Sequence, residues 1–155
     1  MSDAFDLIVI GTGEAGSAAA YTCRKAGWTV AIVDKRRSRP NASEVMNLIG
    51  EVKGRDAILL DDMVDTAGTL TQAAGVLKER GARRVVAYAV HAVLSGPALT
   101  RIRQSPLEQI TFTDTVPLAP GAQALGKIRV LGTERLFGEA ISRIERGDSL
   151  SSLFV

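Results

Sequence analysis

Short apolar runs alternate with longer stretches of helical character along this chain. The clearest apolar or β-branched runs are residues 7–10, 29–33, 57–60 and 84–90. Runs of this length, bounded by polar or glycine residues, are typical of buried parallel strands. Between them, an alanine-rich stretch at residues 14–26 and a second stretch at residues 69–80 predict helices, which Gly27 and Gly81 end.

Weaker patterns complete the set of expected elements. Short strands are predicted at residues 45–49, 110–113 and 128–131, a short helix at residues 97–103, and a polar loop at residues 35–43. Residues 134–146 carry apolar side chains at helical spacing, which predicts an amphipathic helix. Strands and helices in alternation predict a three-layer α/β/α fold with a mainly parallel sheet, in a single domain of residues 1–155.

Composition limits the function classes. The net charge of +2 is too small to indicate a nucleic-acid partner. The single cysteine, Cys23, cannot form an internal disulfide, which fits a reducing compartment. No run approaches the roughly 20 apolar residues of a membrane span, and the first residues lack the basic start of a signal peptide. We therefore expect a cytoplasmic protein that binds neither nucleic acid nor a membrane.

A glycine-rich turn follows the first predicted strand. It has the pattern G-x-G-x-x-G and consists of Gly11, Thr12, Gly13, Glu14, Ala15 and Gly16. Between a strand and a helix, this pattern lets a pyrophosphate approach the helix N-terminus. Asp34 closes the next strand, where a carboxylate can accept hydrogen bonds from an adenosine ribose. The turn therefore indicates either binding of FAD or NAD, or glycines that serve only turn and packing geometry.

A second loop follows the predicted strand at residues 57–60. Its polar and small residues are Asp61, Asp62, Asp65, Thr66, Ala67, Gly68 and Thr69. The last five can present backbone amides and two hydroxyls to a phosphate at a helix start. Asp61 and Asp62 can accept hydrogen bonds from ribose hydroxyls or approach Mg²⁺ through water. The alternative is a plain helix cap beside solvated acids.

Two family resemblances follow from these motifs. Residues 6–34 resemble the opening of glutathione-reductase-type flavoproteins, where this segment binds the ADP half of FAD. Residues 34–155 resemble the C-terminal half of phosphoribosyl pyrophosphate synthetases, through residues 61–69 and also residues 34–37, 44–50, 91–98 and 149–154. The second resemblance implies a Rossmann-like, type I phosphoribosyltransferase-like fold. It also implies that Lys35 and Arg37 are catalytic candidates that close over a triphosphate.

Signatures of two families in one chain indicate a seam near Asp34. We therefore expect an engineered or recombined chimeric scaffold without full catalytic activity, which retains phosphate or phosphoribosyl binding at residues 65–69. One alternative is a dinucleotide-binding protein that uses residues 11–16 and Asp34. A second alternative is a ribose-phosphate diphosphokinase.

The expected ligands are phosphate, sulfate or a small phosphorylated molecule. Mg²⁺ would accompany a phosphoribosyl ligand, without a metal site of the protein's own. The resemblance to the synthetases, which form dimers, implies a homodimer.

Overall fold

Seven strands form one sheet in the computed structural model, which describes residues 6–10, 21, 25, 27, 30–36, 45–49 and 51–153. The strands are β1 (Asp6–Ile10), β2 (Val30–Arg36), β3 (Val45–Ile49), β4 (Asp56–Val64), β5 (Arg84–Ala92), β6 (Gln109–Thr113) and β7 (Ile128–Leu131). Their order is β3-β2-β1-β4-β5-β6-β7, and every neighbouring pair is parallel except β2 with β3. The predicted α/β class with a mainly parallel sheet is confirmed.

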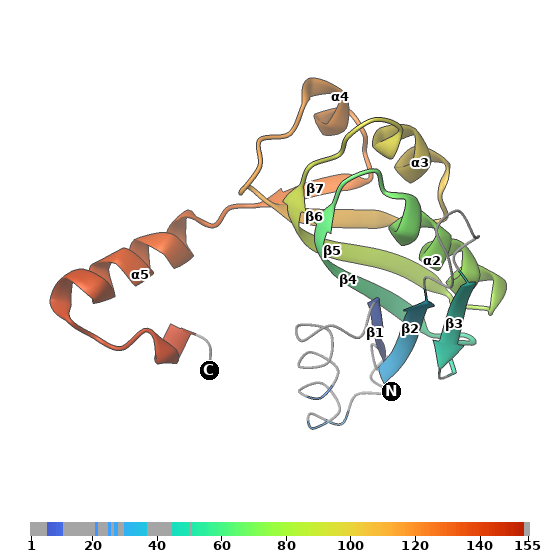
Figure 1. Cartoon of the computed structure of the whole chain (residues 1–155), viewed down its shortest axis with the longest axis horizontal. Coiled ribbons are helices and arrows are strands. Elements are labelled where there is room, and N and C mark those ends of the chain that lie inside the picture. The colour runs from blue at the N-terminus through green and yellow to red at the C-terminus, as the bar shows by residue number, and fades with distance from the viewer. Residues whose placement is uncertain are drawn as a thin grey trace.

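Three helices link the strands from β4 to β7. They are α2 (Gly68–Glu79), α3 (Ala98–Gln104) and α4 (Pro120–Gln123), the last of which the sequence did not predict. The chain passes from β4 to β7 in the order of the strands in the sheet, and successive right-handed crossovers in the same direction place their helices on one face. Figure 1 shows these three helices together. Of the helix predicted at residues 14–26, only Tyr21 and Lys25 are described, and both are helical. The second helical layer therefore stays a prediction.

The core lies between this helical layer and the sheet. The buried residues of α2 are Leu70, Ala73, Ala74 and Leu77. Their spacing follows one helical face, and α2 packs with that face against β4 and β5. On the sheet, the fully buried side chains include Leu59, Val85 and Ile110. Alternation along the strands explains this pattern, because only every second residue faces the helices.

Gly81 ends α2, as the sequence predicts. Its φ is +88°, in the left-handed region where a side chain would be strained. The Gly81 nitrogen donates to the Lys78 carbonyl and the Ala82 nitrogen to the Leu77 carbonyl, both at 3.0 Å. These two bonds satisfy carbonyls that the helix end leaves without partners, so the chain can turn directly into β5.

Two strands are longer than their apolar runs. β2 extends through Lys35 and Arg36, because its end pairs with the antiparallel β3. The predicted loop at residues 35–43 is therefore wrong at its first two positions. β4 continues to Val64, because Met63 and Val64 pair with β5. Hydrogen bonding to a neighbouring strand determines where β2 and β4 end. The hydrophobic pattern of the sequence gives no information about that pairing.

The amphipathic helix predicted at residues 134–146 is confirmed as α5 (Glu134–Arg146). In Figure 1 it stands apart from the sheet, followed by the short 3₁₀ helix η1 (Ser151–Leu153). None of its residues is buried. Among the helices in the described ranges, none combines the length and apolar character needed to cross a membrane.

An ion pair with a buried carboxylate anchors the start of β4. Asp56 is only 6% exposed, and Arg83 Nε donates to its Oδ1 at 2.6 Å. Arg84 Nη1 lies 3.8 Å from the other carboxylate oxygen. The hydrogen bond from Arg83 holds the pKa of the Asp56 carboxyl below its usual value, against the opposing effect of burial. The pair thus ties β4 to the turn that leads into β5.

Replacement of Leu77 by alanine is expected to lower the free energy of unfolding by about 2–4 kcal/mol, because it leaves a cavity in a closed part of the core. Urea denaturation measures this value. Val93→Ala is the control, since Val93 is 44% exposed, and it should change stability by less than about 0.5 kcal/mol. Equal effects of the two substitutions would contradict the placement of Leu77 in the core.

Asp56→Asn is expected to lower the free energy of unfolding by about 1 kcal/mol at pH 7, a small value because Arg83 is half exposed to solvent. Since the folded-state pKa of Asp56 is lowered, its contribution is complete above the unfolded-state pKa and is lost as the pH falls through the folded-state pKa. The difference from wild type should therefore shrink below about pH 4. Denaturation measured at pH 7 and below about pH 4 tests this expectation. The control is Asp148→Asn, which removes the carboxylate of the exposed ion pair with Arg146. A difference that stays constant with pH would contradict the ion-pair explanation.

Candidate phosphate-binding site

The loop between β4 and α2 enters the helix through a strained residue. Ala67 precedes α2 with φ of 58° and ψ of 13°, in the left-handed region that residues with a side chain seldom adopt. Ala67 is buried, whereas Asp65 and Thr66 are exposed. No side chain caps the N-terminus of α2, and its first turn has no acidic residue. The amides of this turn therefore keep the partial positive charge that attracts an anion.

A second loop, residues 93–97 after β5, lies against the first. The Leu94 nitrogen donates to the Val64 carbonyl at 3.0 Å, so the two loops join where their strands end. The Ser95 hydroxyl donates to the carboxylate of Asp65. Leu94 and Gly96 also have positive φ, of 51° and 52°. The sharp turn after β5 thus brings a side chain onto the loop that follows β4.

Arg101 provides a third contact with the loop. It lies in α3, and its Nη1 donates to the Thr66 carbonyl at 2.9 Å. A Cβ added at Gly68 would lie 3.2 Å from the same nitrogen. The absence of a side chain at Gly68 therefore lets a guanidinium lie over the start of α2. Sequence reasoning missed Arg101, because only the fold brings α3 beside this loop.

The carboxylates of Asp61 and Asp62 are arranged differently from the prediction. The sequence placed them at the end of a strand, but β4 continues past both. Consecutive strand residues point to opposite faces, so the two side chains cannot turn to a common ligand within a regular strand. Asp61 is half-buried and accepts a hydrogen bond from the Asp62 nitrogen at 3.0 Å, whereas Asp62 is exposed.

The described residues offer Mg²⁺ a partial set of ligands. Within those ranges, no three His, Cys, Asp or Glu side chains gather closely enough to hold a metal ion. Mg²⁺ needs fewer protein ligands when a substrate phosphate is present, since it keeps several waters and takes one or two carboxylates. The exposed carboxylates of Asp62 and Asp65, beside an anion-attracting helix start, fit that requirement.

The other predicted site residues are described only in part. Gly11, Gly13, Glu14, Ala15, Gly16 and Arg37 lie outside the described residues. The backbones of Asp34 and Lys35 lie in β2, paired with β3. The registers of β1 place Ile32 and Leu60 in one row, and Asp34 and Asp62 each lie two residues further toward the carboxyl end of their strand. The fold thus puts Asp34, Lys35 and the loop at residues 65–69 at one edge of the sheet.

A mainly parallel α/β sheet with a loop and a helix start at its carboxyl edge is a fold shared with phosphoribosyltransferases. A purine phosphoribosyltransferase from Pyrococcus horikoshii matches 82% of this chain with a TM-score of 0.50 at 14% identity, which supports the fold alone. The sequence model of the phosphoribosyl synthetase-associated domain matches residues 24–155. The chain belongs to this family.

Known proteins similar to this chain agree with that assignment. A ribose-phosphate pyrophosphokinase of Burkholderia pseudomallei is 52% identical over 150 residues, which is 96% of this chain and 47% of that protein. The corresponding protein of Bordetella pertussis is 59% identical over 125 residues, 81% of this chain and 40% of that protein. The crystal structure of phosphoribosylpyrophosphate synthetase from Mycobacterium smegmatis matches 94% of this chain and 46% of its own, with a TM-score of 0.78 and 29% identity. The chain spans about half the length of the curated relatives it matches.

These findings overturn the prediction of a chimeric scaffold without full catalytic activity. The family match begins at residue 24, before the predicted seam at Asp34, and the Burkholderia relative aligns with nearly the whole chain. The similar proteins of Burkholderia and Bordetella are named ribose-phosphate pyrophosphokinase, which is the name of an enzyme. The flavoprotein resemblance, and with it FAD or NAD, receives no support from this family. A strand, a glycine turn and a helix recur in many parallel α/β proteins, so the glycine pattern was misleading.

Arg101→Ala is expected to loosen the loop without unfolding the protein. Loss of one hydrogen bond of about 1 kcal/mol should raise amide hydrogen exchange at residues 66–69 about fivefold. Mass spectrometry of peptides from this region measures the change. Arg103→Ala is the control, because Arg103 is on the same helix and exposed. Equal exchange in both variants would show that Arg101 does not hold the loop.

Proposed function

We propose that this chain is the ribose-phosphate-binding part of a ribose-phosphate pyrophosphokinase. The 5-phosphate of ribose 5-phosphate would bind at residues 65–69, against the first turn of α2. The observation that carries the proposal is the N-terminus of α2, which has no side-chain cap and no acidic residue in its first turn. Family membership agrees with this assignment, since the similar proteins are named for the same sugar phosphate.

The loop would recognise phosphate largely through its backbone. The left-handed turn at Ala67 leads directly into the amides of Gly68 and Thr69, and a helix start of this kind favours an anion. The hydroxyls of Thr66 and Thr69 are further donors. Arg101, already bonded to the Thr66 carbonyl, adds a positive charge beside the loop. A phosphate here would need little rearrangement of the chain, which lowers the cost of binding.

The carboxylates near the loop would serve the sugar. The exposed Asp62 is the candidate to accept hydrogen bonds from ribose hydroxyls, because Asp61 points to the opposite face of the sheet, and Asp62 and Asp65 are candidates to hold Mg²⁺ through water. Bound Mg²⁺ would neutralise charge on phosphate oxygens. Because Ser95 donates to the Asp65 carboxylate, that group is oriented before any ligand arrives.

The reaction would transfer a pyrophosphoryl group from ATP to a hydroxyl of the bound sugar phosphate. The hydroxyl oxygen forms a bond to the β-phosphorus and releases its proton to water, the bond from that phosphorus to the α,β-bridging oxygen breaks, and AMP leaves. Lys35 and Arg37 remain the candidates to contact the triphosphate, with Lys35 at the same sheet edge as the loop. We propose that residues 1–155 form one domain, and that this domain binds and orients the sugar phosphate that accepts the pyrophosphoryl group.

Ribose 5-phosphate is expected to raise the melting temperature of the chain. A ligand at 100 times its dissociation constant stabilises the folded state by about 2.7 kcal/mol. For a chain of this length, that corresponds to a rise in melting temperature of roughly 5–10 °C. Gly68→Val should abolish the shift, because its Cβ would already lie 3.2 Å from the Arg101 guanidinium and its methyl groups extend further. Thermal unfolding with and without ribose 5-phosphate and Mg²⁺ measures both results.

The matched control is Gly75→Ala in the same helix, where an added Cβ meets nothing within 4 Å. This variant should keep the full shift. No shift with wild type, or a shift retained by Gly68→Val, would contradict binding at residues 65–69.

A further inference from the structure

Helix α3 carries Arg101 to the candidate phosphate site, and it is too short to hold its own position. It has seven residues, of which Ala98 and Ile102 are buried, and no side chain caps its start at Pro97. A helix of this length is unstable alone, because its few internal hydrogen bonds do not offset the cost of starting a helix. The position of α3 therefore depends on contacts from other parts of the chain.

Lys127 makes such contacts at the C-terminal end of α3. Its ammonium group donates to the carbonyls of Ser105 at 2.7 Å, Arg103 at 3.2 Å and Ile102 at 3.3 Å. An ammonium group has three N–H donors, so each of them has a carbonyl here. The C-terminal end of a helix also carries a partial negative charge, which favours a cation at this place.

The backbone of Lys127 is fixed in turn by the sheet. Lys127 directly precedes β7, and the Ile110 nitrogen of β6 donates to its carbonyl at 2.8 Å. Its side chain is half-buried, and 22 to 25 residues of sequence separate it from the carbonyls that it contacts. The start of β7 therefore acts as the anchor that holds the end of α3.

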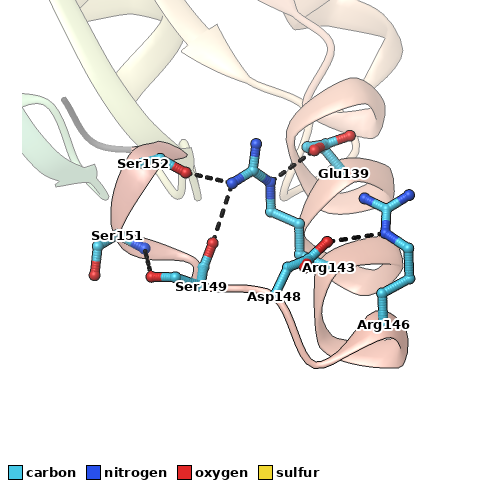
Figure 2. Close-up of polar contacts among 7 residues, drawn as sticks. All are labelled: Glu139, Arg143, Arg146, Asp148, Ser149, Ser151 and Ser152. Carbon is cyan, nitrogen blue, oxygen red and sulfur yellow. Dashed lines mark hydrogen bonds and ion pairs between the residues drawn. The ribbon is translucent and has the colours of Figure 1, made fainter.

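The end of α5 shows a different arrangement, in which a helix holds the chain that follows it. Arg143 of α5 donates to the Ser149 carbonyl at 3.1 Å and to the Ser152 hydroxyl, six and nine residues further along the chain (Figure 2). In the last turn of α3, Arg101 donates instead to the loop after β4. Lys127 thus supplies a cation at the end of α3 from outside the helix.

Arg101 transmits the position of α3 to the phosphate loop. Its Nη1 donates to the Thr66 carbonyl at 2.9 Å and lies over Gly68. Hydrogen bonds weaken steeply away from their preferred distance and angle, so a shift of α3 would weaken this bond. Strands β4 to β7 are all parallel, so Lys127, before β7, and residues 65–69, after β4, lie at opposite edges of the sheet. Lys127 can therefore affect the loop only through α3.

We propose that Lys127 is a positioning residue for the phosphate loop at residues 65–69. By fixing the end of α3 it keeps Arg101 within reach of the Thr66 carbonyl, and it thereby holds the loop in one conformation. The consequence for ligand binding rests on the proposed function, in which this loop binds ribose 5-phosphate. The consequence for the loop itself requires no ligand.

Amide hydrogen exchange of the full chain, measured by mass spectrometry, tests the effect on the loop. Lys127→Met should raise exchange at residues 66–69 about threefold, less than the roughly fivefold expected for Arg101→Ala, because the bond to Thr66 is weakened and not removed. Lys127→Arg keeps N–H donors and the charge, and should exchange like wild type. Should Lys127→Met fail to fold, Lys127→Gln is measured in its place with the same expectation.

The matched control is Lys53→Met. Lys53 is an exposed lysine in the turn before β4, at the same edge of the sheet as Lys127. Its substitution should leave exchange at residues 66–69 unchanged. Equal exchange in the Lys53 and Lys127 variants would refute the proposal.

The double variant Lys127→Met/Arg101→Ala separates positioning from a general effect on stability. Once Arg101→Ala has removed the bond to Thr66, Lys127→Met should add nothing to exchange at residues 66–69, because two residues that act through one contact are not additive. A general loss of stability would raise exchange again in the double variant, and that result would overturn the proposal.

Titration calorimetry with ribose 5-phosphate and Mg²⁺ tests the effect on binding. Lys127→Met should weaken binding about threefold in the wild-type background and leave it unchanged in the Arg101→Ala background. Equal affinity of wild type and Lys127→Met would contradict a role of Lys127 in binding. If wild type does not bind ribose 5-phosphate, the proposed function is wrong, and exchange at residues 66–69 still decides whether Lys127 positions the loop.

Discussion

The parallel pairing of β4 with β5 is the constraint on which the rest of the structure depends. The register runs from Asp56 with Arg84 to Val64 with Ala92, so the two strands end side by side. Their following loops must then meet, as the hydrogen bond from Leu94 to Val64 shows. The contacts of Ser95 and Arg101 with the first loop follow from this geometry. Register in the sheet thus determines which side chains surround the candidate phosphate site.

Local strain concentrates at the same place. Ala67 and Leu94 both adopt left-handed backbone conformations, which cost about 1–2 kcal/mol each for residues with a side chain. Such strain persists only where surrounding structure fixes it. Here the buried methyl group of Ala67 and the adjacent core residue Leu70 supply that support. Packing of the core therefore offsets the backbone strain of the loop and keeps the loop in one conformation before a ligand binds.

Much of the fold could be predicted from the sequence, because the spacing of apolar residues and the positions of glycines indicate the type and ends of local elements. The helix at residues 134–146 and the glycine stop at Gly81 are examples in which local chemistry decides the outcome. The ends of β2 and β4 could not be predicted, because they depend on pairing partners distant in the chain. Arg101 was missed for the same reason. The phosphate site at residues 65–69 was predicted from its residue types and stays a prediction, whereas the glycine pattern at residues 11–16 led to a wrong family because many folds share that geometry.

The two outer strands of the sheet have a consequence for colloidal behaviour. β3 has five residues and β7 has four, and β7 carries a charged side chain, Arg129, within that length. Unpaired strand edges are templates for fibril growth. A short, charged edge strand offers few backbone hydrogen bonds to an incoming strand. Open-ended aggregation through the sheet edges is thereby disfavoured, even at the high concentrations at which a protein with an exposed apolar helix would otherwise precipitate.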